Sequence, residues 1–143
     1  KKGRIVYGGG GIRPDVFISN DYDFQTATQK ILTNPERLTF KYAKIVIQGF
    51  DSNKSFVEFN EEIKQSDIID INNFIEWLNQ VDENFDIKNQ DIIDDWAKIE
   101  NRIYAEVARI LWGNDYYYHI MLNQDIQFQT ALENLETAKA IRN

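Results

Sequence analysis

His119 is the only histidine in this chain of 143 residues, and the chain contains no cysteine. A serine–histidine–aspartate triad would therefore have to use this one imidazole as its base. The residue lies in a tyrosine-rich segment beside Ile120 and Met121, which favours a packed or rim histidine over a catalytic base. A di-metal carboxylate centre needs two Glu-x-x-His motifs, whereas Tyr116 stands three residues before this histidine. A stand-alone hydrolase that uses His119 and an aspartate is therefore the weakest interpretation of the chain.

Four acidic residues, Asp91, Asp94, Asp95 and Glu100, could serve acid–base catalysis or calcium binding. Their spacing is not that of an EF-hand loop. Negative charge is favourable in the first turn of a helix, because it opposes the positive end of the helix dipole. We therefore interpret this group as a helix N-terminus followed by a solvated face.

Four consecutive glycines occupy positions 8–11, and a glycine-rich loop can cradle a phosphate. The dinucleotide fingerprint needs a sixth-position glycine, but Arg13 stands there and Pro14 follows where the helix should start. The Gly-Lys-Ser/Thr ending of a P-loop is also missing. The glycines are better explained as a sharp bend or a close approach of two backbones. We therefore expect no catalytic, cofactor-binding or metal site in the chain.

The composition argues against several further classes of protein. The net charge is −7, with 23 acidic and 16 basic residues, which argues against binding to nucleic acid or to anionic lipid. No apolar run reaches the roughly 20 residues of a membrane span. Aromatic residues make up 13% of the chain, which is enough for a packed core and too many for a disordered chain.

Apolar residues recur at helical spacing from Phe24 onward, and we expect a mainly α fold: an irregular bundle of about five to six helices. A short β segment at the N-terminus should precede the bundle. Asn34 and Pro35 predict the start of the second helix, Ser66 caps the third, and Gly113 ends the longest one. Residues 51–65 should form a loop with one short helix at most. The expected helices are 24–31, 35–48, 66–81, 88–112, 114–122 and 126–140, the last with Phe128, Leu132, Leu135 and Ala138 facing inward.

Trp112, Tyr116, Tyr117 and Tyr118 form the strongest candidate contact surface, because tyrosine and tryptophan are enriched at interfaces. The alternative is structural: Trp112 and two of the three tyrosines would pack under the turn that follows Gly113. The sequence favours the structural interpretation, and the contact surface is kept as the candidate site.

Two stretches resemble a known family. The first, Gly3-Arg-Ile-Val-Tyr-Gly-Gly-Gly-Gly-Ile-Arg-Pro-Asp-Val16, is similar to the segment that closes the protease core of carboxyl-terminal processing proteases, also called tail-specific proteases, in their Bacteroidetes-type form. The second resembles the C-terminal helical region of the same proteins. It comprises Ile103-Tyr-Ala-Glu-Val-Ala-Arg-Ile-Leu-Trp-Gly113, the pair Tyr116-Tyr117, Asp125, and Gln129-Thr-Ala-Leu132.

The resemblance implies a parent serine endopeptidase with a lysine base and a PDZ domain that captures unfolded or C-terminally tagged substrates. It also implies the periplasm or cell envelope of a Gram-negative bacterium. The catalytic serine and lysine would lie before Lys1, and none of the family's catalytic residues maps onto this chain. We therefore expect a fragment of the enzyme that has no activity of its own.

The resulting domain assignment has three parts: the terminal β segment of the protease core at 1–18, a hinge at 19–23 and a helical C-terminal domain at 24–143. The helical domain would pack on the upstream protease and PDZ domains, form a homo-oligomer or shape substrate access. The alternative is an independent helical protein-binding module with no protease upstream.

Overall fold

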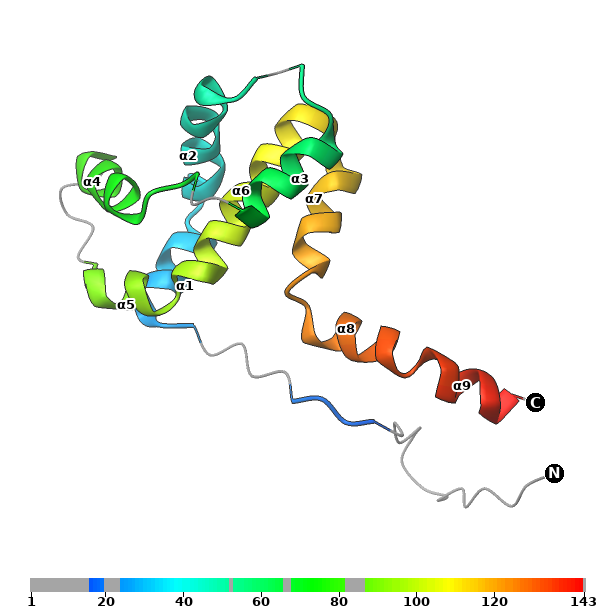
Figure 1. Cartoon of the computed structure of the whole chain (residues 1–143). Helices are drawn as coiled ribbons and strands as arrows, with labels where there is room; N and C mark the ends of the chain where they lie inside the picture. Colours follow the sequence, from blue (N-terminus) through cyan, green and yellow to red (C-terminus); the bar gives the residue numbers. More distant parts are fainter. Residues whose placement is uncertain (1–15, 20–23, 52, 66–67, 82–86, 143) are drawn as a thin grey trace.

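The computed structural model is mainly helical, which confirms the predicted fold class (Figure 1). It describes residues 16–19, 24–51, 53–65, 68–81 and 87–142. The predicted β segment at 1–18 and the hinge at 19–23 therefore lie almost entirely outside the described residues. The described residues 16–18 form no strand.

The described ranges contain nine α-helices and one 3₁₀ turn. None of these helices combines the length and apolar character that crossing a bilayer requires. The elements are α1 (Thr26–Thr33), α2 (Leu38–Val46), η1 (Ile47–Gly49), α3 (Phe56–Gln65), α4 (Ile71–Val81), α5 (Asn89–Asp94), α6 (Trp96–Trp112), α7 (Asn114–Leu122), α8 (Ile126–Glu133) and α9 (Leu135–Arg142).

Helix α6 is the centre of the bundle, with α2, α3 and α7 packed against it (Figure 1). Its apolar residues Ile99, Ile103 and Val107 are fully buried. Ala105 and Ala108 are fully buried as well, and such small residues allow neighbouring helices to approach closely. The helix is therefore covered on more than one side, as expected for the core element of a small bundle.

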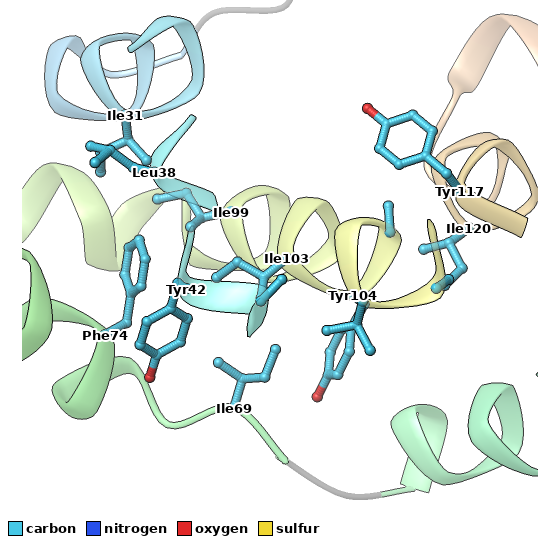
Figure 2. Close-up of a cluster of buried hydrophobic side chains, with 14 of the residues drawn as sticks. Ile31, Leu38, Tyr42, Ile69, Phe74, Ile99, Ile103, Tyr104, Tyr117 and Ile120 are labelled. Carbon is cyan, nitrogen blue, oxygen red and sulfur yellow. The ribbon is translucent and has the colours of Figure 1, made fainter. Parts of the chain in front are cut away.

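Residues from α1, α2, α4, α6, α7 and the segment before α4 meet in the core (Figure 2). Tyr42 of α2 lies edge-on to Phe74 of α4, with ring centroids 4.9 Å apart. Figure 2 shows Ile99 and Ile103 of α6 beside these rings, and Ile69 enters from the segment before α4. This cluster links α4 to the α2–α6 pair across a long stretch of sequence.

The predicted start of the second helix is wrong. Asn34 follows α1 instead, and its side-chain oxygen accepts a hydrogen bond from the Glu36 backbone N–H at 2.8 Å. Arg37 then adopts a left-handed conformation with φ +56°, and α2 begins at Leu38. Asparagine readily makes such a local turn, because its short side chain competes for backbone N–H groups.

The segment 51–65, predicted as a loop with one short helix, contains the helix α3, which takes up its second part. Ser55 and Glu58 form a reciprocal cap: the Ser55 backbone N–H donates to the Glu58 carboxylate at 2.8 Å, and the Glu58 N–H points back at Ser55 Oγ at 3.4 Å. This is the Ser-x-x-Glu capping box, a signal that was present in the sequence. The helix buries Phe59 completely against Phe50 and Trp112.

Two other helix boundaries differ from prediction. Helix α4 begins at Ile71, after Asp70 accepts a hydrogen bond from the Asn73 N–H at 2.9 Å. The predicted cap at Ser66 lies outside the described residues. The predicted helix over 88–112 divides at Asp95 into α5 and α6, but it ends as predicted at Gly113, whose φ is +103°.

The predicted C-terminal helix also divides, at Asn134, and its inward face is wrong. Phe128, Leu132 and Leu135 are all exposed, and so is Ala138. Figure 1 shows why: α8 and α9 lead away from the rest of the bundle, so nothing in the described part of the chain covers that face.

Candidate functional site

The four predicted contact residues differ in their burial and in the residues that they contact. Trp112 and Tyr116 lie together against Phe56 of α3, with ring centroids 5.7 and 4.6 Å from that of Phe56. Tyr117 is buried, whereas Tyr118 is 63% exposed. Neighbouring helical residues point about 100° apart, so three consecutive tyrosines cannot share one face. Trp112 is half-buried and Tyr117 is buried, whereas Tyr116 and Tyr118 are exposed, and the contact role of the four residues stays a prediction.

His119 is exposed at the rim of the same aromatic group. Its ring lies edge-on to Phe56, with centroids 5.2 Å apart. Among the described residues, no group of three or more histidine, aspartate or glutamate side chains is placed to hold a metal ion.

The acidic group forms a helix cap, although not for its own helix. The Gln25 backbone N–H donates to Asp95 Oδ2 at 2.7 Å, and the Ala27 N–H donates to Asp91 Oδ2 at 3.1 Å. These donors belong to the start of α1, where backbone N–H groups have no partner within the helix. Two carboxylates, one from the first turn of α5 and one from the α5–α6 junction, therefore hold the N-terminus of α1. The predicted solvated face applies to Asp94, which is exposed.

Asp95 is a buried anion with strong partners. Burial raises its pKa, but hydrogen bonds from Lys98 Nζ at 2.7 Å and from Gln25 outweigh that effect, so the pKa is lowered overall. The carboxylate is therefore charged at neutral pH. It fixes α1 against α5, and through α1 it positions the groove described below.

Three guanidinium groups surround a single buried carboxylate, Glu106 of α6. Arg102 Nε lies 3.7 Å from Glu106 Oε1, Arg37 Nη2 lies 3.8 Å from Oε2, and Arg109 also contacts Oε2. The glutamate side chain is 3% exposed, and burial raises its pKa against the opposing effect of Arg102 and Arg37. We call these four residues the arginine cluster.

Two aromatic rings support the arginine cluster. Arg37 and Arg109 lie 4.3 and 5.2 Å from the ring centroid of Phe40. Arg102 and Arg109 lie 5.1 and 5.3 Å from that of Tyr117. The negative faces of aromatic rings attract guanidinium groups, so these rings hold the arginines in place. Tyr117, predicted as a contact residue, therefore serves to position the arginines.

A groove with a volume of about 440 Å³ lies beside the arginine cluster, and Arg102 is one of its lining residues. Its walls come from α1, α6, α7 and the start of α8. Its apolar side chains include Leu32, Met121 and Leu122, and Tyr118 stands at its edge. The other lining residues are Ser19, Phe24, Lys98, Asn101, Gln124, Asp125, Ile126 and Gln127.

Neither the arginine cluster nor the groove was predicted from the sequence. The spacing of Arg102, Glu106 and Arg109 was a usable signal, because residues three and four apart meet on one helix face. Arg37 comes from the turn before α2, and no local pattern could place it beside Glu106.

Comparisons with protein-family models, with curated proteins and with solved structures find no match to this chain.

Proposed function

We propose that this chain is the non-catalytic helical C-terminal domain of a carboxyl-terminal processing serine endopeptidase of the cell envelope. The proposal starts from the family resemblance of the N-terminal glycine-rich stretch and of the α6–α8 sequence. In this proposal the domain hydrolyses nothing by itself, and it packs on the protease core of the same polypeptide. The parent enzyme would cleave envelope proteins with a serine and a lysine located before Lys1.

The observation that carries the proposal is the uncovered apolar face of α8 and α9. Ile126, Leu132 and Leu135 are 65%, 46% and 48% exposed, and Phe128 of α8 is 36% exposed. Val16 and Phe17 are exposed as well. Large contiguous apolar surfaces on a folded domain mark interaction sites. We assign this face to the upstream protease core, because the chain leads to that core through residues 16–19.

The first experiment is peptide sequencing by mass spectrometry of the intact protein purified from its source. We expect peptides upstream of Lys1 that contain a candidate serine nucleophile, a lysine base and a PDZ-like segment. A mature protein that starts within a few residues of Lys1 would contradict the proposal. The chain would then be an independent helical protein-binding module.

A second experiment tests the surface. The double variant Leu132→Ser/Leu135→Ser should lose binding to the separately produced upstream core in isothermal titration calorimetry, and its far-UV circular dichroism should not change. The matched control is Val57→Ser on α3, which removes a side chain that is also exposed (69%) but lies on another helix. If both variants bind the core with the same affinity, α8–α9 is not the docking face.

A further inference from the structure

Three cations lie around the ring of Phe40, where α2 packs on α6. Arg37 Cζ, Lys44 Nζ and Arg109 Cζ are 4.3, 4.7 and 5.2 Å from the centroid of that ring. Arg37 and Lys44 stand three and four residues from Phe40, so they follow one face of α2, whereas Arg109 comes from α6. We call Arg37, Lys44 and Arg109 the cation patch.

All three members of the cation patch are accessible from solvent. The side chains of Arg37 and Arg109 are 53% and 26% exposed, and Lys44 is exposed as well. Arg102, the remaining arginine of the arginine cluster, differs from them because its Nε is buried. A ligand in solution can therefore contact the cation patch directly, but not Arg102 Nε.

The negative charge beside the cation patch does not balance its positive charge. Glu106 is buried; it contacts Arg109, but it lies 3.8 Å from Arg37 Nη2, which is too far for a hydrogen bond. Glu36, the acid next to Arg37 in the sequence, pairs with Lys41 instead. The lysine of the patch pairs with no carboxylate of the described residues. Three cations therefore share one buried carboxylate, in a chain whose net charge is −7.

This surplus of positive charge favours an anion that offers several acceptor oxygens. Like charges at short distance repel one another, and the contacts with the Phe40 ring hold the cations in place without neutralising them. A phosphate group carries about 1.5–2 negative charges at pH 7 and presents three strong acceptor oxygens. Guanidinium and ammonium groups both bind phosphate. A carboxylate, with a single charge and two oxygens, matches three separate cations less well.

We propose that the cation patch binds the phosphate group of a small soluble ligand, with Arg37, Lys44 and Arg109 as the hydrogen-bond donors. A small ligand needs only these three side chains. A lipid surface or a nucleic acid would also face the rest of a chain that carries an excess of negative charge. The inference goes beyond the proposed function and does not depend on it.

The test is a titration of the whole ¹⁵N-labelled chain with inorganic phosphate, followed by ¹H–¹⁵N correlation spectra, with acetate at matched ionic strength as the reference anion. We expect saturable shifts in α2 and in the last turns of α6, and at least about tenfold weaker affinity for acetate, as for a lost charged hydrogen bond. Saturable shifts that are absent or confined to other elements, or equal affinity for both anions, would overturn the proposal. Phosphatidylcholine vesicles with and without phosphatidic acid test the lipid source by co-sedimentation. Binding to the phosphatidic acid vesicles without binding to free phosphate would overturn the assignment to a soluble ligand.

Variants of the exposed cations locate the site. Lys44→Gln and Arg37→Gln should each weaken phosphate binding about tenfold. Both variants should fold, because Lys44 is exposed and the ion pair of Arg37 is long. The matched control is Lys139→Gln, which removes an exposed lysine of α9 and should leave the affinity unchanged. An equal loss in the control, or unchanged affinity in the folded Lys44 and Arg37 variants, would overturn the proposed site.

Discussion

Removal of the Asp95 carboxylate should detach the start of α1 from the α5–α6 junction. Asp95 accepts a hydrogen bond from the Gln25 N–H at 2.7 Å, and it is 5% exposed. Hydrogen bonds to charged groups contribute about 1.5–3 kcal/mol, and loss of a helix cap costs about 0.5–2 kcal/mol. The ion pair with Lys98 adds little, because that lysine is 44% exposed. We therefore expect Asp95→Ala to lower the free energy of unfolding by about 2 kcal/mol.

Urea unfolding followed by far-UV circular dichroism measures this loss. Asp94→Ala is the matched control, because Asp94 is the adjacent residue but is exposed, and its change should stay within about 0.5 kcal/mol. Asp91→Ala should lie between the two, since its bond to the Ala27 N–H is longer, at 3.1 Å. Equal midpoints for Asp95→Ala and Asp94→Ala would refute the cross-helix cap.

The pH dependence gives a second check on Asp95. Its pKa in the folded chain is lowered, so the folded state favours the charged carboxylate. Its contribution to stability is therefore present above the ordinary aspartate pKa and is lost as the pH falls through the lowered value. The stability difference between the native chain and Asp95→Ala should be constant near neutral pH and should shrink in acid. A difference that grows in acid would contradict this sign.

The other predictions concern the core, the α6–α7 turn and Glu106. In urea unfolding, Phe59→Ala should lower the free energy of unfolding by about 3–5 kcal/mol, because the ring is fully buried. Val57→Ala, on the exposed side of α3, should lower it by under about 1 kcal/mol. Gly113→Ala should lower stability by about 1–3 kcal/mol through backbone strain at φ +103°, and Gly49→Ala, without that strain, should be neutral; a similar loss in both would point to packing. For Glu106 the pKa is raised, so the pH dependence is opposite to that of Asp95. The contribution of Glu106 to the free energy of unfolding falls as the pH rises from the ordinary glutamate pKa to the raised pKa of the folded chain. The free energy of unfolding of Glu106→Gln should therefore increase relative to that of the native chain as the pH rises through this range. A decrease relative to the native chain would contradict the raised pKa.

Local patterns predicted the parts of the fold that depend only on neighbours in sequence. The apolar period predicted a helix over 88–112, and three of its apolar residues, Ile99, Ile103 and Val107, are fully buried in α6. Gly113 ends that helix as predicted, because a positive φ suits glycine. Asn34 misled the prediction, since the same short side chain that caps helices also forms turns.

The roles of the charged residues could not be predicted in this way. Asp95 looks like a first-turn acid of its own helix, but the group that it caps lies 70 residues earlier. Arg37 likewise joins Arg102 and Glu106 only after α2 packs on α6. A charged side chain on a helix surface has the same local pattern whether it faces water or another helix. The sequence therefore favoured a helix N-terminus with a solvated face for Asp95 and gave no role to Arg37.

The C-terminal helices show what an apolar pattern leaves undetermined. The spacing of Leu132 and Leu135 predicted an inward face, but each remains about half-exposed. Burying a leucine fully contributes about 1.5–3 kcal/mol, so roughly 1 kcal/mol per side chain remains to be gained against a partner. If these residues serve only the fold, Leu132→Ser/Leu135→Ser should reduce stability with or without the upstream core. If they serve docking, the variant should keep most of its stability alone and lose the stabilisation that the core provides, and thermal unfolding with and without the core separates the two.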